Sequence, residues 1–184
     1  MRDVIETNRL KLRMLRMKDA QRVAGLCGDP AVARMIARAP LPYLPIAAEG
    51  WIMTLAARKP LGADFVYAVD LDGEGLIGAI GAHKVGETGF EAGYWFGRPY
   101  WGRGYATEAL TAFLEAAGNL GPLQAGHFVD NPASGRVLEK TGFAYTGEVK
   151  PLFSLARGES VLSKRMRFAE AAGRGAGERA AVAA

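Results

Sequence analysis

Cysteine is nearly missing from this 184-residue chain, which contains a single one, Cys27. One thiol cannot close an internal disulfide or assemble a thiolate zinc site, and we expect no bound metal. Apolar residues recur around Cys27 at helical spacing, which predicts that it packs in a core rather than acting as a nucleophile. The shortage of cysteine favours a reducing, cytoplasmic location.

Long apolar runs are missing as well. No stretch of about 20 mostly apolar residues occurs, so no transmembrane helix and no membrane partner are predicted. The first residues alternate between basic and apolar positions and lack the unbroken apolar segment of a secretion signal. Hydrophobic residues make up 49% and charged residues 23% of the chain, as in ordinary globular domains. We therefore expect one domain over residues 1–168.

A strong charge of one sign is also missing. Lys and Arg number 23 against 19 Asp and Glu, and the basic residues are scattered apart from Lys164, Arg165 and Arg167. A nucleic-acid surface usually carries a basic cluster with interleaved aromatic residues, so we expect no nucleic-acid partner. An anionic small ligand accounts for the same net charge of +4. Residues 169–184 contain eleven Ala or Gly, which predicts a disordered tail.

Periodicity divides the remainder into strands and helices. Alternation predicts strands at residues 9–16, 65–70, 75–83, 90–96, 124–129, 145–153 and 160–168. Helical spacing predicts helices near residues 20–27, 30–36, 48–55, 106–117 and 132–141. Asp29-Pro30 and Asn131-Pro132 are typical helix starts, and Gly142 suits the left-handed position after a helix end.

The loop at residues 98–105 links a predicted strand to a predicted helix. Gly102 and Gly104 remove two Cβ atoms where a ligand can approach, and the following helix start favours an anion such as pyrophosphate. Arg98 and Arg103 add positive charge. The alternative is a turn whose glycines only relieve strain. The loop lacks the Lys-Ser/Thr ending of a P-loop and the following acidic residue of a Rossmann fingerprint.

Three motifs resemble one known family. Residues 100–109 (Tyr-Trp-Gly-Arg-Gly-Tyr-Ala-Thr-Glu-Ala) resemble the acetyl-CoA pyrophosphate loop of the GNAT N-acetyltransferase superfamily. Residues 130–143, from Asp-Asn-Pro-Ala-Ser to Thr-Gly-Phe, resemble its second CoA-contacting helix. Residues 6–13 are similar to the start of the ribosomal-protein-alanine N-acetyltransferase-like branch. The resemblance covers residues 5–168.

This resemblance implies an α+β fold with helices flanking a mostly antiparallel sheet of six to seven strands. The sheet is expected to splay between its fourth and fifth strands, residues 90–96 and 124–129, with the pantetheine arm of acetyl-CoA in the gap. The resemblance implies that Asn131 hydrogen-bonds the pantetheine arm; the alternative is a helix N-cap, and the residue can do both. The implied cofactor contacts are Tyr94, Trp95, Phe96, Trp101, Gly102, Arg103, Gly104, Tyr105, Ala106, Asn131, Ser134 and Arg136.

Acyl transfer to an amine needs stabilisation of the leaving thiolate. Many superfamily members use a tyrosine four residues before the Gly-Phe pair, but this chain has Leu138 there. The related branch carries a serine that matches Ser134. We hypothesise that Ser134 stabilises or protonates the thiolate; the alternative is a small residue bonding the helix backbone.

The attacking amine must also lose a proton. Glu91 on the fourth predicted strand is the candidate base, and the alternative is a solvated outward position. His83 and His127 are further candidates, although a strand histidine is often structural. None has a Ser or Asp partner at a recognisable triad spacing, which favours direct attack in a ternary complex.

The acceptor is expected to be a primary amine, on a protein N-terminus or a small molecule. Candidate walls of its site are Tyr43, Trp51 and Phe153, and Glu49 or Glu159 can attract a cationic amine. All five can equally be packing or surface residues. The competing interpretation is a non-catalytic CoA-binding sensor or scaffold, and a homodimer is possible.

Overall fold

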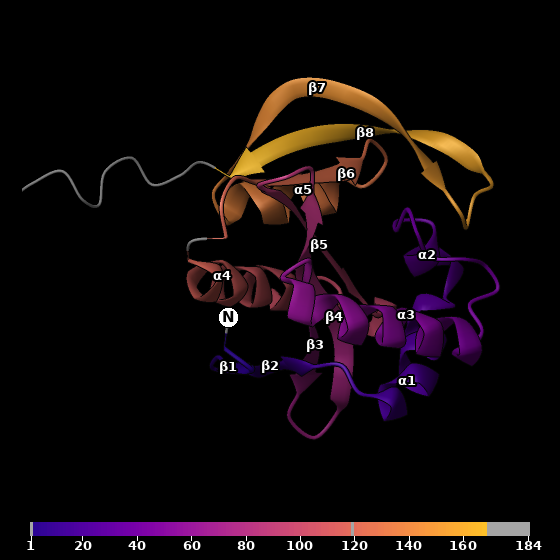
Figure 1. Ribbon diagram of the computed structural model, residues 1–184. Helices are drawn as coiled ribbons and strands as arrows, with labels where there is room; N and C mark the ends of the chain where they lie inside the picture. Colours follow the sequence, from indigo (N-terminus) through magenta and orange to yellow (C-terminus); the bar gives the residue numbers. More distant parts are fainter. Residues whose placement is uncertain (1, 119, 169–184) are drawn as a thin grey trace, which may run out of the picture.

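The structure, a computed structural model, describes residues 2–118 and 120–168, which form one eight-stranded sheet. The strand order across the sheet is β1-β2-β3-β4-β5-β6-β8-β7 (Figure 1). The strands are β1 (Val4–Glu6), β2 (Leu10–Met14), β3 (Asp64–Leu71), β4 (Gly75–Val85), β5 (Gly89–Phe96), β6 (Leu123–Phe128), β7 (Phe143–Ser154) and β8 (Glu159–Phe168). The predicted tail, 169–184, lies outside the described residues.

The sheet is antiparallel except where β5 meets β6. That parallel pair needs a crossover, and the helix between residues 105 and 117 provides it. Only two register pairs join the strands, Phe90 with Leu123 and Glu91 with Gln124. Beyond Glu91 the strands diverge, so the predicted splay between residues 90–96 and 124–129 is confirmed.

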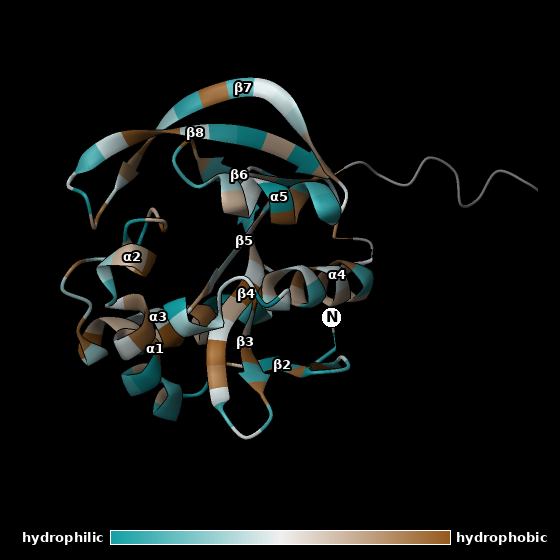
Figure 2. Ribbon diagram, turned by 180° about the vertical axis from the view of Figure 1, so that it is seen from behind, coloured by the Kyte–Doolittle hydropathy of each residue, from teal (hydrophilic) through white to brown (hydrophobic). Residues whose placement is uncertain are grey.

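Helices cover both faces of the sheet. On one face α4 and α5 pack over the larger core, and on the other α1 and α3 pack over the smaller clusters. Hydrophobic residues gather on the central strands β3 and β4 between these layers (Figure 2). The helices are α1 (Ala20–Cys27), α2 (Pro30–Ala33), α3 (Pro45–Arg58), α4 (Tyr105–Ala117) and α5 (Pro132–Lys140), with 3₁₀ turns at Met17–Asp19, Lys59–Leu61 and Arg98–Tyr100.

The local signals for helix ends are confirmed. The Asp29 side chain accepts from the backbone N–H of Ala31 at 2.8 Å and begins α2. Gly142 follows α5 with a φ of 98°, in the left-handed region where glycine is favoured. Phe143 and Leu138 then lie in the same core cluster.

No helix among the described residues is long and apolar enough to cross a membrane.

The sheet has one strand more than the sequence predicted. β1 spans three residues and pairs antiparallel with β2, from Val4 opposite Arg13 to Glu6 opposite Lys11. Three residues are too few for alternation to be recognised, which explains why this strand was not predicted.

Candidate functional site

The loop between β5 and α4 is tied to the sheet and bends at its two glycines. Gly102 has a φ of 73° and Gly104 a φ of 80°. These left-handed values suit glycine, which has no Cβ to clash. The indole N–H of Trp101 donates to the carbonyl oxygen of Phe96 at 2.7 Å, anchoring the loop to the end of β5.

Free backbone N–H groups gather where this loop becomes α4. The N–H of Trp101 donates to the Arg98 carbonyl oxygen at 3.2 Å. Among the described residues, the next N–H along this segment that donates to a carbonyl is that of Glu108, at 3.1 Å from the oxygen of Gly104. Residues 102–107 therefore present the unpaired N–H groups of a helix start, with its positive dipole end, to an anion.

The acidic residue in the first turn of α4 is neutralised. Glu108 Oε2 lies 2.6 Å from Arg9 Nη2, and Glu108 Oε1 accepts from the Thr7 hydroxyl at 2.6 Å. Burial raises the pKa of Glu108, but the hydrogen bonds from Thr7 and Arg9 outweigh burial and hold the pKa below its ordinary value. Arg9 also lies over the Tyr105 ring, 4.6 Å from its centroid. The positive charge of Arg9 thus compensates the negative charge of Glu108, which would otherwise repel a phosphate.

The start of α5 faces the gap between β5 and β6. Asn131 is the N-cap, because its side-chain oxygen accepts from the backbone N–H of Ser134 at 3.2 Å. This contact uses only the oxygen of the amide, which leaves the side-chain NH₂ group as a donor for a ligand. Arg136 is exposed on the same helix. Leu138 is 1% exposed and packs in the core of the protein.

Tyr94 of β5 and Ser134 of α5 form a hydroxyl pair. The Tyr94 Oη lies 2.8 Å from Ser134 Oγ and 3.0 Å from the Ser134 carbonyl oxygen, so its one proton can be donated to either atom. Tyr94 packs on the α4–α5 side, whereas Trp95 packs on the α1–α3 side, because side chains alternate along a strand. Burial raises the pKa of Tyr94 to about 12, against a lowering by the Ser134 hydrogen bond. The phenol is therefore a neutral donor.

His127 of β6 is buried and fully engaged. Its Nδ1 lies 2.8 Å from the Phe128 carbonyl oxygen and its Nε2 lies 2.9 Å from Tyr145 Oη. Since a carbonyl only accepts, Nδ1 carries a proton, and in the neutral ring Nε2 accepts from Tyr145. A Cβ on Gly135 of α5 would lie 2.7 Å from His127 Nε2. These contacts support the structural role of His127.

Glu91 lies on the opposite face of β5, with Gly93 and Trp95. Arg165 of β8 donates from Nη1 to Glu91 Oε1 at 2.8 Å. Gly126 of β6 makes room for this arginine, since a Cβ there would lie 2.6 Å from Arg165 Nη1. A Cβ on Gly93 would meet no heavy atom of the described residues within 4 Å, so the strip beside Glu91 is open. Sequence reasoning noted Arg165 only within a basic run and missed this contact.

His83 has an acidic partner that the sequence did not predict. Its Nδ1 lies 2.8 Å from Oδ1 of Asp64, a carboxylate 3% exposed that also binds Arg58. His83 lies opposite Asp64 on β3 and opposite Glu91 on β5. The three side chains therefore form a polar row on the face that carries the open strip.

The tip of the β7–β8 hairpin closes one end of this face (Figure 1). Arg157 binds both carboxylate oxygens of Asp130, at 2.9 and 3.0 Å, and Arg34 binds the same carboxylate at 2.9 Å. The N–H of Leu155 donates to the carbonyl of Ala37 at 2.9 Å. Sequence reasoning missed this junction, because its residues come from distant segments.

The candidate acceptor residues divide into packed and exposed ones. Tyr43 and Trp51 pack against the cluster under α1 and α3, which supports a packing role for both. Phe153 is 54% exposed near the hairpin tip. Glu49 is half-buried and Glu159 is exposed. The structure does not bring these five residues together through any hydrogen bond or ion pair among the described residues.

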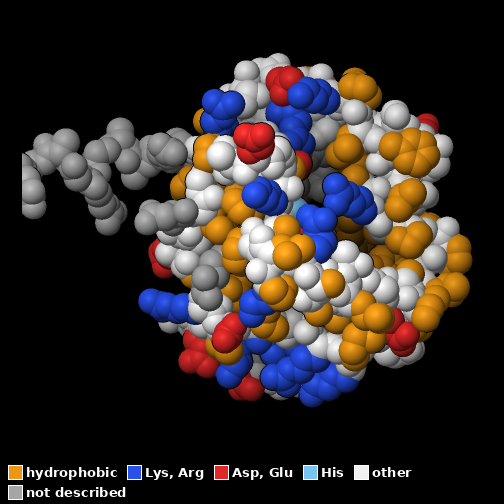
Figure 3. Space-filling view, viewed as in Figure 1, with side chains coloured by type: hydrophobic (Ala, Val, Ile, Leu, Met, Phe, Trp, Pro, Cys, Tyr) orange, Lys and Arg blue, Asp and Glu red, His pale blue; other side chains and the backbone are white. Residues whose placement is uncertain are grey.

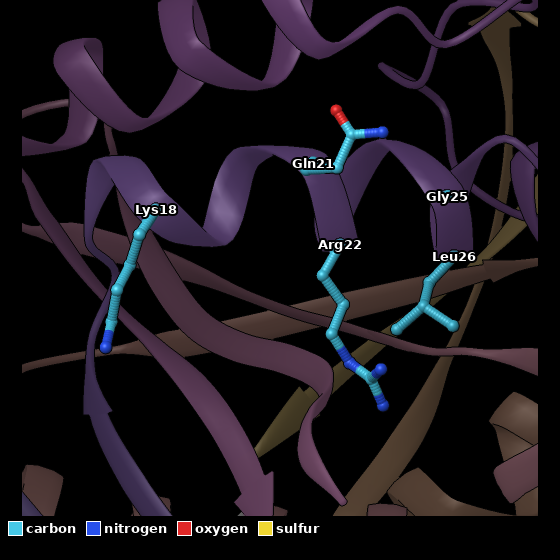
Figure 4. Close-up of a pocket in the computed structure, with 5 residues that line it drawn as sticks. All are labelled: Lys18, Gln21, Arg22, Gly25 and Leu26. Atoms are coloured by element: carbon cyan, nitrogen blue, oxygen red, sulfur yellow. The ribbon is translucent and has the colours of Figure 1, made fainter.

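The described surface is hollowed on the face seen in Figure 1 and along α1. Figure 3 shows the first of these hollows, with Lys and Arg side chains along one border and hydrophobic side chains along the other. A separate depression of about 400 Å³ lies along α1 (Figure 4). It is lined by Lys18, Gln21, Arg22, Gly25 and Leu26. None of these five belongs to the predicted site.

Comparisons with known proteins agree with this geometry. A model of the acetyltransferase (GNAT) domain family matches residues 9–144. An uncharacterised N-acetyltransferase of Bacillus subtilis, YoaA, is 28% identical over 153 residues, which cover 80% of this chain and 86% of YoaA. The crystal structure of a GNAT-family acetyltransferase from Bacillus anthracis has a TM-score of 0.75 at 26% identity, covering 90% of this chain and 97% of that one.

A more distant structure shares the fold. The ribosomal-protein-S5-alanine acetyltransferase of Vibrio fischeri has a TM-score of 0.74 at 18% identity, covering 88% of this chain and 94% of that one. The family match spans most of the chain and includes the loop, the helix start and the divergent strands described above. The protein therefore belongs to the acetyltransferase (GNAT) family and is an N-acetyltransferase.

Proposed function

We propose that this enzyme moves the acetyl group of acetyl-CoA to a primary amine, on a protein N-terminus or a small molecule, by direct attack in a ternary complex. The observation that carries the proposal is the divergence of β5 from β6 after Glu91. Backbone groups that leave a ladder need other partners, and the amide-rich pantetheine arm can supply them along Tyr94, Trp95 and Phe96.

The remaining donor contacts follow from the two helix starts. The N–H groups of residues 102–107 would bind the pyrophosphate, with Arg103 adding charge. The Asn131 side-chain NH₂ would donate to the pantetheine arm, and the exposed Arg136 would lie near the CoA phosphates. Both helices begin beside the gap between the strands, so one extended molecule can reach all of these groups.

The chemistry assigns two further roles. Glu91, beside the open strip at Gly93, would take the proton of the amine directly or through water. Ser134 would donate a hydrogen bond to the sulfur as the carbon–sulfur bond breaks. The acceptor would enter from the face that carries Glu91, where Glu159 and Glu49 can attract a cationic amine.

One experiment tests the proposal against a non-catalytic CoA-binding sensor. The protein is incubated with acetyl-CoA and a library of peptides and small amines, and acetylated products and released CoA are followed by mass spectrometry. Transfer is expected with the wild-type protein and a large loss with Glu91→Gln. Glu87→Gln, an acid-to-amide change at an exposed turn residue, serves as the matched control. CoA binding by calorimetry without any transfer would favour the sensor, and absence of CoA binding would reject both.

A further inference from the structure

Leu138 of α5 is buried and offers no hydroxyl to a leaving sulfur. A phenol nevertheless reaches the same helix from the sheet, because Tyr94 Oη lies 2.8 Å from Ser134 Oγ. We propose that Tyr94 is a positioning residue that orients the Ser134 hydroxyl toward the leaving sulfur. This inference rests on the proposed function, since it concerns how Ser134 acts in that reaction.

The two hydroxyl groups have a limited number of donors and acceptors to share. Tyr94 has one phenolic proton and two acceptors on Ser134, the carbonyl oxygen at 3.0 Å and Oγ at 2.8 Å. An α-helix already pairs that carbonyl with the N–H four residues later, so the carbonyl does not depend on the phenol. When Tyr94 donates to Oγ, the serine keeps its own proton for a second acceptor. Donor and acceptor roles along such a chain also reinforce each other.

The surroundings of Tyr94 keep it a donor. Its ring lies among the core residues under α4 and α5, with the Phe96 ring centroid 6.5 Å away. This packing restricts the phenol to the neighbourhood of Ser134. Because burial also disfavours the phenolate, Tyr94 keeps its proton while Ser134 acts.

The proposed step balances without an added reactant. The amine nitrogen forms a bond to the acetyl carbon, and the carbon–sulfur bond breaks with its electron pair moving to sulfur. The amine proton leaves to Glu91 or water. The thiolate accepts a hydrogen bond from the Ser134 hydroxyl, which in turn accepts one from Tyr94. Neither hydroxyl needs to lose its proton.

The test measures the thiol of bound CoA rather than turnover. CoA is added to saturation, and the thiolate absorbance of the complex is followed across pH. A hydrogen bond to a charged group stabilises it, so Tyr94→Phe should lower the acid dissociation constant of the bound thiol by about tenfold. Ser134→Ala should lower it at least as far. The double variant should match Ser134→Ala, because Tyr94 acts through Ser134.

Tyr145→Phe is the matched control. It removes a phenol hydroxyl beside the same helix that contacts His127 instead of Ser134, and the thiol should titrate as in the wild type. Ser134→Thr keeps a hydroxyl and should keep most of the wild-type acidity of the bound thiol. This comparison with Ser134→Ala tests the hydroxyl even if a Tyr94 variant folds poorly. An unchanged thiol in a folded, CoA-binding Tyr94→Phe protein, or additive losses in the double variant, would overturn the proposal. Failure of the wild type to bind CoA would instead reject the proposed function.

Discussion

Single buried positions are constrained by close neighbours. Cys27 is 2% exposed, and burial raises the pKa of its thiol to about 12, so the predicted packing role is confirmed. Gly135 is constrained more tightly, because the His127 ring and the Tyr145 hydroxyl occupy the space where its Cβ would lie. Gly25 of α1 is also helical, but a Cβ there would meet nothing among the described residues within 4 Å.

These two helical glycines should respond oppositely to alanine. Gly135→Ala forces His127 or α5 to move, and such overpacking should lower the free energy of unfolding by about 1–3 kcal/mol. Gly25→Ala should raise it by about 0.5–1 kcal/mol, because alanine reduces the freedom of the unfolded chain. Urea unfolding of both variants measures the difference. Equal effects would show that the space beside His127 is not limiting.

Between elements, the hairpin tip is held to α2 by the Asp130 carboxylate, which binds Arg157 and Arg34, and by a hydrogen bond from Arg157 Nε to the Arg34 carbonyl oxygen at 2.8 Å. The hydrogen bond from Arg157 lowers the pKa of Asp130, against a raising by burial, and the charge of Arg34 adds to the lowering. Docking therefore favours the ionised form of Asp130. Its contribution to stability is fully present above the ordinary pKa of 3.8 and is lost as the pH falls through the lowered pKa.

Asp130→Asn should release the hairpin tip without unfolding the sheet. The amide of Leu155, which bonds the Ala37 carbonyl, should exchange with solvent several-fold faster, as measured by hydrogen–deuterium exchange. Glu148→Gln on the same hairpin, whose carboxylate pairs with Lys150 at 2.8 Å on an exposed surface, is the control and should leave this amide unchanged. Unchanged exchange in Asp130→Asn would mean that the Leu155–Ala37 and Arg157–Arg34 hydrogen bonds dock the tip without the carboxylate.

Across the chain, ion pairs with little exposure link β2 to the turn before α1 and to β3. Arg13 of β2 binds Asp19 at 2.7 Å and Asp70 of β3 at 2.6 Å. Burial raises the pKa of Asp19, but hydrogen bonds from Arg13 and from the N–H of Arg16 outweigh it and lower the pKa. The pKa values of Glu108 and Asp130 are also lowered by their hydrogen-bonded partners.

Stability should therefore fall in acid. All three carboxyl groups favour ionisation in the folded state, so their contributions to stability are complete above their ordinary pKa values and are lost as the pH falls through the lowered ones. Urea midpoints should be similar at about pH 7 and pH 5 and clearly lower at about pH 3. Asp19→Asn should cost about 3 kcal/mol at neutral pH, because it leaves Arg13 partly unpaired. It should also flatten the acid dependence, and an unchanged pH profile would contradict this origin.

Local patterns in the sequence were sufficient for most elements. Alternation at 90–96 and 124–129 predicted β5 and β6, and their divergence followed from the family resemblance. The positive φ values of Gly102 and Gly104 agree with a loop that approaches a ligand. These signals succeed because periodicity and glycine conformation act within a few residues of the chain.

The chemistry of the site depends on longer distances. Tyr94 and Ser134 are 40 residues apart, His83 and Asp64 are 19 apart, and Glu91 and Arg165 are 74 apart. Each contact exists because the sheet places particular strands and helices side by side, which no local pattern specifies. The amino-acid order was thus enough to indicate strands, helix starts and an anion-binding loop. The choice of partner for each hydroxyl, carboxylate and imidazole came from strand order and register, since side-chain pairing needs the assembled sheet.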